Sequence, residues 1–273
     1  MTDAFLAIPA TRAGFDEFAR LVVELGHGEP LPDPDTWTTQ IAPDLVFLAC
    51  EGACVGYVWV QVMDGVGYVR HVVVDPGRRG QGLGRRLMAI AAERLLANGC
   101  TRWELNVKPD NAPALALYRS LGMDFEYPTW VLRLPPEQAG GLPAEDPALR
   151  VDELPAERDA ELAAAFRVPR GVFAFHRRKP RTRVFTVMRH ARPCGLALFD
   201  PRIDGCFPFR AADPAVARAA IEALAPHLSS PAAELLLAIE RDGAVAEALL
   251  ALGATLRFRI EHLAGPLVAP ASR

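Results

Sequence analysis

The sequence has no long uncharged hydrophobic run and few of the residues that form disulfides or hold metals. No stretch reaches the eighteen or more apolar residues of a membrane-spanning helix, and residues 1–4 carry no basic region ahead of an apolar segment. The five cysteines are odd in number and match neither redox nor common zinc spacing, and the six histidines are scattered. We therefore expect a cytoplasmic protein with buried free thiols, no metal and no membrane partner.

The sequence is, in contrast, rich in apolar residues. Its 273 residues are 51% hydrophobic and carry a formal net charge of −3. A chain of this length and composition can fill two hydrophobic cores of ordinary domain size. We expect a globular protein of two domains.

A β-branched run at residues 72–74 leads through a glycine-rich loop into a helix with regularly spaced apolar residues. Glycines at 77, 80, 82 and 84 allow backbone amides to approach a ligand, next to the positive end of the helix dipole. Such a loop suits phosphate. It has neither the Gly-Lys-Ser/Thr of a Walker A loop nor a clean G-x-G-x-x-G Rossmann pattern with an acid about twenty residues later.

A second segment places two polar residues on one helix. A predicted strand at 103–107 precedes Asn111, and the helix that follows carries Tyr118 and ends near Gly122. Asn111 suits a helix N-cap and Gly122 suits a helix end. Seven residues are close to two turns, so Asn111 and Tyr118 face the same side, roughly 10 Å apart.

Together, these segments resemble the two signatures of the GCN5-related N-acetyltransferases, the GNAT superfamily. Residues 79–84, Arg-Gly-Gln-Gly-Leu-Gly, match the Arg/Gln-x-x-Gly-x-Gly/Ala pyrophosphate loop, and the order strand, Asn, helix, Tyr, Leu-Gly matches the second signature. The resemblance covers about residues 3–134. It implies direct transfer, in a ternary complex, of the acetyl group of the co-substrate acetyl-CoA to a primary amine of a small molecule or peptide.

The resemblance also implies roles for individual residues. Backbone groups of Val72, Val73 and Val74 would pair with the pantetheine arm, and an N–H near Val74 would polarise the thioester. Asn111 would bind the pantetheine or a bridging water, and Tyr118 would act as general acid toward the departing thiolate. The pyrophosphate would be held by backbone amides, with charge added by Arg79, Arg85 or Arg86. The expected loop contacts are Arg79, Gly80, Gln81, Gly82, Leu83, Gly84 and Arg85.

The general base is left open. An alkylammonium has a pKa of about 10, so a group must accept its proton at neutral pH. Some family members place a Glu five positions before the Asn, but here that position is Asn106, which cannot act as a base. Glu104 lies on the same face of the strand because side chains alternate, and His71 is a second possible base. A structural role is the alternative for each.

The predicted elements of residues 4–134 follow the mixed α/β order of the GNAT fold: strand, helix, three strands, helix, strand, helix, strand. Residues 135–148 are rich in Pro and Gly and are predicted to be an exposed linker. Residues 149–273 repeat the order. We predict two tandem GNAT-like domains, 1–134 and 149–273, each with a twisted, mostly antiparallel central sheet flanked by helices.

Fixed points of the two halves can be aligned. Asp75 matches Asp213 and Gly122 matches Gly253, which makes the second copy seven residues shorter. The missing length is about that of the glycine loop, and Leu249 replaces Tyr118. We therefore predict that the second half is a degenerate copy without a coenzyme site. In tandem enzymes of the mycothiol synthase type the competent half is typically the second, whereas here it is the first.

Two charged segments have both a functional and a simpler interpretation. No acid lies between Glu161 and Asp200, while Arg167–Arg192 contains nine Lys and Arg residues. A patch for nucleic acid or a phosphorylated substrate is one interpretation. A pI near 6.1 and the lack of interleaved aromatics favour a solvated hairpin at 177–183. The loop acids Glu29, Asp33 and Asp35 could attract a cationic amine or simply be solvated.

Two classes of function remain. The first is an acetyltransferase, either a monomer with an internal pseudo-dimer or a homodimer. The second is a non-catalytic acetyl-CoA-binding or sensing module whose second half binds a partner. Asn111 and Tyr118 argue for the enzyme, because a sensor has little need of a proton donor beside the sulfur. The fold alone does not identify the acceptor amine.

Overall fold

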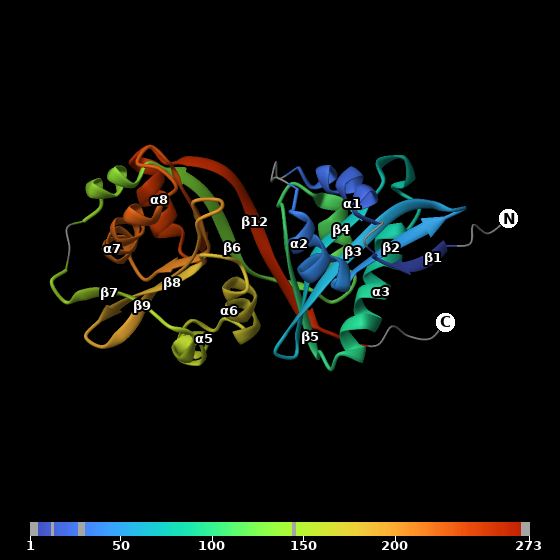
Figure 1. The fold of residues 1–273 in the computed structure, drawn as a ribbon, viewed down its shortest axis with the longest axis horizontal. Helices are drawn as coiled ribbons and strands as arrows, with labels where there is room; N and C mark the ends of the chain where they lie inside the picture. Colours follow the sequence, from blue (N-terminus) through green and yellow to red (C-terminus); the bar gives the residue numbers. More distant parts are fainter. Residues whose placement is uncertain (1–4, 12–13, 27–30, 144–145, 269–273) are drawn as a thin grey trace. The chain divides into compact units, whose positions relative to one another are not determined.

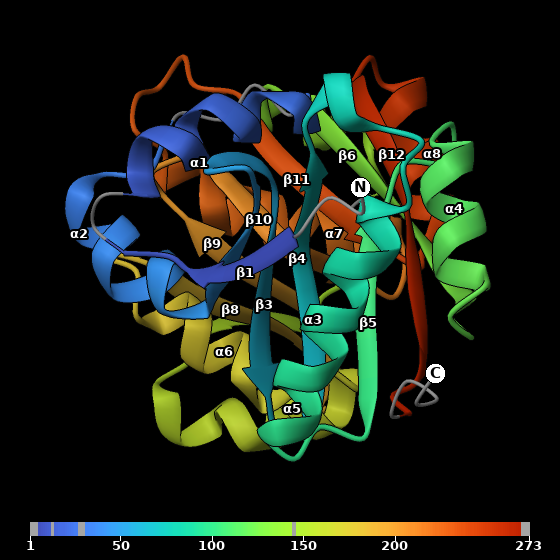
Figure 2. The same cartoon turned by 90° about the vertical axis from the view of Figure 1, so that its right-hand side faces the viewer.

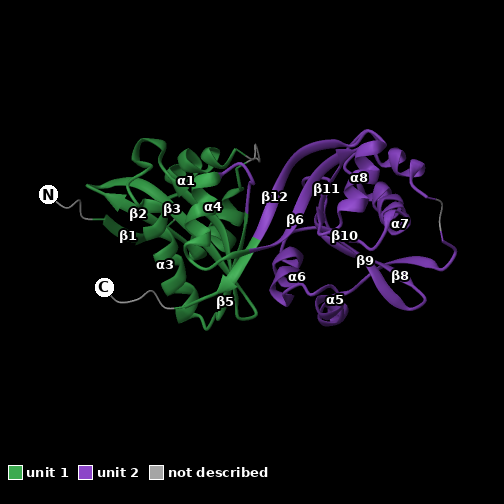
Figure 3. Ribbon diagram, turned by 180° about the vertical axis from the view of Figure 1, so that it is seen from behind, with its two compact units in different colours: residues 1–106, 112–124, 263–273 green, residues 107–111, 125–262 purple. Residues whose placement is uncertain are grey.

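The computed structural model describes residues 5–11, 14–26, 31–143 and 146–268, and its contacts divide the chain into two compact units (Figures 1 and 3). Unit 1 contains residues 1–106, 112–124 and 263–273. Unit 2 contains residues 107–111 and 125–262. Each unit has its own hydrophobic core and contains its own run of strands of a twelve-stranded sheet.

Unit 1 is built on a sheet in the order β1-β2-β3-β4-β5-β12. The first four strands pair antiparallel, and β4 pairs parallel with β5. The strands are β1 (Phe5–Pro9), β2 (Leu45–Cys50), β3 (Ala53–Met63), β4 (Val66–Val74) and β5 (Arg102–Val107). The last residues of β12, a strand that spans Thr255–Pro266, complete the set. The helices are α1 (Phe15–Val22), α2 (Pro34–Thr36), α3 (Leu83–Ala97) and α4 (Ala112–Arg119), with single turns at Val23–Leu25, Trp37–Ile41, Ala42–Asp44 and Pro76–Arg78.

Helices cover both faces of this sheet because its strands alternate in side-chain direction. A β-carbon at Gly56 or Gly67 would contact Leu87 or Leu95 of α3, so these glycines face α3. Tyr57 faces the other side and packs on Phe18 of α1, with ring centroids 5.4 Å apart. Helices α1 and α3 therefore lie on opposite faces of β3 and β4 (Figure 2).

Unit 2 has a sheet in the order β12-β6-β11-β10-β9-β8-β7. Its pairing repeats that of unit 1, since β7 to β10 pair antiparallel and β10 pairs parallel with β11. The strands are β6 (Asp124–Leu134), β7 (Leu149–Glu153), β8 (Arg183–Arg189), β9 (Arg192–Asp200), β10 (Gly205–Ala211), β11 (Leu235–Glu240) and the first part of β12. The helices are α5 (Asp159–Phe166), α6 (Arg170–Arg177), α7 (Pro214–Leu224) and α8 (Gly243–Ala251), with single turns at Pro136–Gly141, Ala156–Arg158 and Ala225–His227.

The last strand of each sequence half pairs in the unit formed mainly by the other half. Strand β6 pairs antiparallel with β11, with Leu134 opposite Leu235 and Thr129 opposite Glu240. The end of β12 lies beside β5, and the Leu267 N–H donates to the Thr101 carbonyl at 2.9 Å. Figure 3 shows the change of unit along β12. The compact units thus have different bounds from the sequence ranges 1–134 and 149–273, whose division into two domains stays a prediction.

Two local expectations are wrong. The segment 135–148 is not simply exposed, because Ala139 and Leu142 are buried in the core of unit 2. The segment 177–183 is not a hairpin: α6 ends at Arg177 and a turn leads into β8. The buried His176 in α6 hydrogen-bonds the Arg183 carbonyl at 3.2 Å, which ties this turn to the helix.

The expected free thiols are confirmed, since all five cysteines are free and Cys50, Cys100 and Cys206 are buried. None of the helices in the described ranges is long and apolar enough to cross a membrane. In the same ranges, no three His, Cys, Asp or Glu side chains converge as metal ligands.

Candidate active site

The parallel strands β4 and β5 separate part-way along their length. They pair in register from Val66 opposite Arg102 to Val69 opposite Leu105, and a bulge in β4 follows at Arg70. Beyond the bulge, residues 72–74 pair with β3 alone in the described part of the chain. One edge of β4 therefore offers backbone donors and acceptors that an extended ligand can pair with as an added strand.

A glycine loop connects the end of β4 to α3. Gly80 and Gly82 have φ of 77° and 78°, a conformation that side chains with a β-carbon rarely adopt, and there is open space beside both. Gly82 is the N-cap of α3, and no described side chain caps this end. The first-turn N–H groups, from Leu83 to Arg85, therefore have no partner within the helix. At the positive end of a fifteen-residue helix they suit an anion.

Helix α4 packs on the first turn of α3. A β-carbon at Gly84 would lie 3.2 Å from Leu117, and Arg85 donates to the Ser120 hydroxyl at 2.6 Å. These contacts flank Tyr118, whose side chain is 8% exposed. Burial raises the pKa of Tyr118 to about 12. The phenol is therefore protonated at neutral pH, as a proton donor must be.

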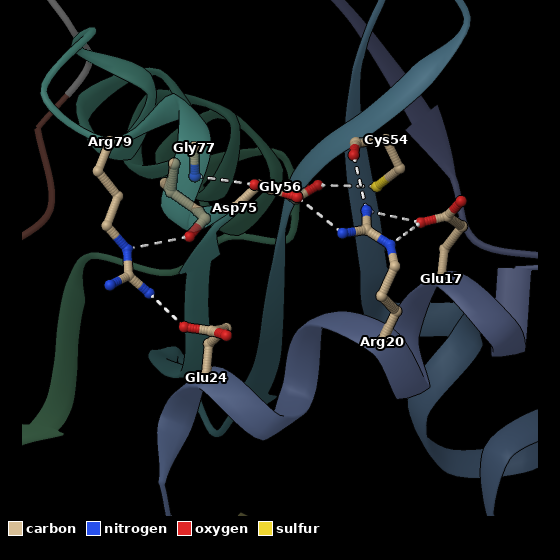
Figure 4. A network of polar contacts seen from close by, with 9 residues as sticks. Glu17, Arg20, Glu24, Cys54, Gly56, Asp75, Gly77 and Arg79 are labelled. Atoms are coloured by element: carbon tan, nitrogen blue, oxygen red, sulfur yellow. Dashed lines mark hydrogen bonds and ion pairs between the residues drawn. The ribbon is translucent and has the colours of Figure 1, made fainter.

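An arginine on α1 holds the turn between β4 and the loop (Figure 4). Arg20 donates to Asp75 Oδ2 at 2.7 Å, to Glu17 Oε2 at 2.8 Å and to the Cys54 carbonyl at 2.9 Å. The second oxygen of Asp75 accepts the Gly77 N–H at 3.0 Å. The hydrogen bond from Arg20 lowers the pKa of Asp75. This carboxylate thus links α1 to the start of the loop.

Arg79, the first residue of the loop motif, is held by a residue of the turn that follows α1 (Figure 4). Its guanidinium donates to Glu24 at 2.7 Å and to the Val74 carbonyl at 3.3 Å. No sequence motif singles out Arg20 or Glu24. Each forms a hydrogen bond with a residue 55 positions away in the sequence. The neighbouring residues indicate only that Arg20 and Glu24 belong to the polar side of an amphipathic segment.

Both possible bases lie on the sheet face that α1 covers. His71 is opposite Trp59 on β3, and its Nδ1 lies 3.1 Å from the Tyr57 hydroxyl. Glu104 is opposite Tyr68 on β4, and Tyr68 faces away from α3 because its neighbour Gly67 faces α3. The structure thus places Glu104 and His71 on one face, on neighbouring strands. Their chemical roles stay predictions, as does that of Asn111, which directly precedes α4.

The structure does not show the loop acids Glu29, Asp33 and Asp35 together as a cluster. Glu29 lies outside the described residues. Asp33 caps α2, accepting the Thr36 N–H at 2.9 Å and the Thr36 hydroxyl at 2.7 Å, so it has a structural task. Asp35 is exposed.

Acids from outside the basic segment pair with several of its arginines. Arg177 meets Asp159 at 2.6 Å, and Arg189 meets Asp213 at 2.8 Å. Lys179 lies 3.5 Å from Asp200. These pairs reduce the positive charge available to a polyanion.

At the equivalent places, the described residues of unit 2 contain neither a glycine loop nor a tyrosine. Helix α7 begins directly after Asp213, which caps it by accepting the Val216 N–H at 3.0 Å, so no glycine loop intervenes. Strands β10 and β11 pair as far as Phe209 opposite Ile239, and the partners of Arg210 and Ala211 lie on β9. Next to this pair, Arg210 donates to Glu240 at 2.8 Å, and both side chains are nearly buried.

Leu249 takes the structural place of Tyr118. The Tyr118 carbonyl accepts the N–H groups of Leu121 and Met123, and the Leu249 carbonyl accepts those of Leu252 and Ala254. Gly122 and Gly253 then end their helices with φ of 79° and 97°. The two helices terminate alike, but only the one in unit 1 carries a phenol.

Residues 16–123 match the model of the acetyltransferase (GNAT) family. They form a GNAT acetyltransferase domain. The match includes β4, the glycine loop, α3 and the helix of Tyr118. The predicted family and mixed α/β fold class are thus confirmed.

Known proteins extend this result. A mycothiol acetyltransferase of Clavibacter michiganensis is 43% identical over 79 residues, which are 28% of this chain and 26% of that relative. One from Thermomonospora curvata is 36% identical over 121 residues, 40% of this chain and 41% of that relative. The chain thus spans less than half the length of these relatives.

Solved structures show that the GNAT fold extends over nearly the whole chain. A GCN5-related N-acetyltransferase from Sphaerobacter thermophilus covers 96% of both chains with a TM-score of 0.63 and 16% identity. A tandem GNAT protein from the clavulanic acid biosynthesis pathway covers 98% of this chain and all of its own, with a TM-score of 0.60 and 19% identity. The fold is therefore that of a tandem GNAT protein.

Proposed function

We propose that the GNAT domain transfers the acetyl group of acetyl-CoA to a primary amine of a small molecule or peptide by direct transfer in a ternary complex. One observation carries the proposal. After β4 separates from β5, its free edge leads into the glycine loop and then into α3. The first turn of α3 has no capping side chain among the described residues and packs against the helix of Tyr118. Acetyl-CoA matches this arrangement, because it has an extended pantetheine arm with a pyrophosphate at one end and the reacting thioester at the other.

Binding would use the backbone first. Residues 72–74 of β4 would pair with the amide groups of the pantetheine arm. The amides of the loop and of the first turn of α3 would take the pyrophosphate, with Arg79 and Arg85 adding charge. Asn111 would bind the arm or a bridging water. These contacts fix the thioester at the end of β4, where the N–H near Val74 would polarise its carbonyl.

Transfer would then proceed in two bond changes. The amine nitrogen attacks the thioester carbon and forms a tetrahedral intermediate, and the carbon–sulfur bond breaks as this collapses. Before this attack, the alkylammonium loses one proton to Glu104 or His71, directly or through water, because only the neutral amine can attack. As the intermediate collapses, its nitrogen loses a second proton to solvent, and Tyr118 gives its proton to the departing sulfur and recovers one from solvent.

Unit 2 would bind no coenzyme, because Asp213 caps α7 directly where unit 1 has its glycine loop, and Leu249 stands in the place of Tyr118. Similar curated proteins are named mycothiol acetyltransferases, yet the matches cover less than half of them, so we propose only the class of acceptor. Two GNAT-like units in one chain would allow a monomer with an internal pseudo-dimer, and a homodimer is the alternative. We propose no role for nucleic acid.

The test is a calorimetric titration of the full chain with acetyl-CoA. We expect one site per chain, lost in Gly82→Trp, where a large side chain would fill the loop. Gly65→Trp is the matched control, because Gly65 also has a positive φ, 76°, with open space beside it, but sits in the turn between β3 and β4. Two sites would show that unit 2 kept a coenzyme site, and no binding would overturn the proposal.

A panel of amines then separates the enzyme from a sensing module. The panel holds a polyamine, an aminoglycoside, free amino acids and peptides with a free N-terminus or a lysine. The readout is thiol release from acetyl-CoA. Amine-dependent release that Gly82→Trp abolishes and Gly65→Trp keeps is expected of the enzyme. Binding without release on any amine would favour the sensor.

A further inference from the structure

We propose that Gly265, on the last strand of the chain, is a positioning residue for Tyr118. The inference rests on the proposed role of Tyr118 as general acid. The end of β12 is an integral part of unit 1, because Leu263, Ala264 and Leu267 are all buried there. The hydrogen bond from Leu267 to Thr101 fastens the end of the strand.

Gly265 lies against the turn that ends α4. A β-carbon at Gly265 would lie 2.1 Å from the carbonyl oxygen of Gly122, 2.9 Å from its carbonyl carbon and 3.1 Å from Met123 Cα. All three are backbone atoms, so no side-chain rotation can relieve the overlap. Only a glycine lets β12 lie this close to the turn.

The same turn is hydrogen-bonded to the backbone of Tyr118. The Tyr118 carbonyl accepts the Leu121 N–H at 3.0 Å and the Met123 N–H at 3.2 Å. Gly122, between these donors, has a φ of 79°, so the turn has few other conformations open to it. A displacement of residues 122 and 123 would therefore be passed to the end of the helix that carries the phenol.

The consequence is specific to the proton transfer. A general acid must lie within hydrogen-bond reach of the sulfur, and a shift of about 1 Å in such a group can lower the rate on the order of 100-fold. The glycine loop and β4, which would hold acetyl-CoA, are held mainly by α1 and β3, whereas Arg85 reaches the turn that ends α4 through the Ser120 hydroxyl. We therefore expect acetyl-CoA binding to change much less than kcat. The second half of the chain would thus position the acid of the first half without touching a substrate.

The first test is Gly265→Ala in the full chain, assayed with the best amine from the panel or, failing one, by thiol release to water. We expect kcat to fall by about tenfold or more, while the calorimetric Kd for acetyl-CoA stays within about twofold. Gly195→Ala is the matched control in unit 2. Its β-carbon would lie 2.8 Å from Val216 and 2.9 Å from Val187, so it crowds a core remote in sequence from Tyr118. It should leave kcat unchanged.

A double variant separates positioning from general loss of stability. In a Tyr118→Phe background, Gly265→Ala should cause no further loss of kcat, since the group it positions is gone. A further loss equal to that in the wild type would overturn the inference, as would a normal kcat in Gly265→Ala alone. A normal kcat in Tyr118→Phe would instead overturn the proposed acid role, and the inference with it.

A second variant covers the case in which Gly265→Ala does not fold. Leu263→Ala only removes buried atoms from the same stretch of β12, so it loosens the strand without an overlap. We expect the same loss of kcat and the same absence of a further loss with Tyr118→Phe. Additive losses would overturn the inference here too.

Discussion

The guanidinium of Arg20, on the first helix, hydrogen-bonds the carboxylate of Asp75 at 2.7 Å, where β4 ends and the glycine loop begins. The pair is partly exposed, so its contribution to stability is that of a surface ion pair, about 0–1 kcal/mol. Its geometric effect is larger, because Asp75 also accepts an N–H of the loop itself. Arg20 therefore sets the place of the loop more than it stabilises the fold.

Arg20→Gln should accordingly weaken acetyl-CoA binding severalfold and leave the Tm nearly unchanged. The loop would lose its anchor to α1 while the core stays intact. The measurements are a calorimetric titration and a thermal melt. Arg158→Gln is the matched control, since it breaks an ion pair of similar exposure with Glu161 in unit 2 and should change neither. An unchanged Kd in Arg20→Gln would show that the loop holds its place unaided.

Tyr118→Phe should lower kcat by about 100-fold or more and leave the Kd for acetyl-CoA unchanged, because only the proton donor is lost. Tyr127→Phe in unit 2 is the control. The pH profile gives an independent check. With its pKa raised to about 12, Tyr118 stays protonated well above the ordinary tyrosine pKa of about 10.

The wild-type kcat should therefore not fall on the alkaline side between about pH 8 and 10. The sign follows from the role: an acid is lost only as the pH rises through its own pKa. A wild-type alkaline limb in that range which vanishes in Tyr118→Phe would contradict the burial of the phenol. A limb that persists in the variant would belong to another group.

Glu104→Gln should remove the acidic limb of the kcat/KM profile, whereas His71→Gln should keep it. Burial raises the pKa of Tyr57, so its hydroxyl is protonated and can donate to His71 Nδ1. A neutral His71 that accepts this bond carries its proton on Nε2 and has no lone pair left for the amine. The opposite result would make His71 the base, with Tyr57 accepting its Nδ1 proton.

The sequence allowed the local parts of this site to be predicted. The run at 72–74, the glycine loop and the helix that follows are contiguous, and each is specified by neighbouring residues. The same holds for the helix of Tyr118 and the strand order of the second half. Even the missing loop at Asp213 followed from spacing alone, because a deletion between matched fixed points has a definite length.

What the sequence did not predict is non-local. Nothing in β6 or β12 indicates which strand it will pair with, since both alternate in a way that suits either sheet edge. The place of Gly265 against Gly122 depends on that exchange. Helix α6 was not predicted, since it is only eight residues long, contains Gly171 and buries few side chains, Phe173 and His176.

The ion pair between Arg210 on β10 and Glu240 on β11 gives a last prediction. The two side chains are 11% and 10% exposed, and Arg210 also donates to the Phe166 carbonyl, so both charges are satisfied. Removing one partner leaves the other charge buried and unpaired. Arg210→Met should therefore destabilise the chain by about 3–5 kcal/mol, as measured by denaturant unfolding.

Replacing both partners should cost far less, because the double variant Arg210→Met, Glu240→Leu leaves no buried charge. Well-packed apolar residues in place of a buried ion pair are often neutral or stabilising. The double variant should still bind one acetyl-CoA per chain, since removing the ion pair supplies neither a glycine loop nor a phenol to unit 2. If it were as unstable as Arg210→Met, the pair would stabilise unit 2 by its attraction, beyond the avoidance of an unpaired charge.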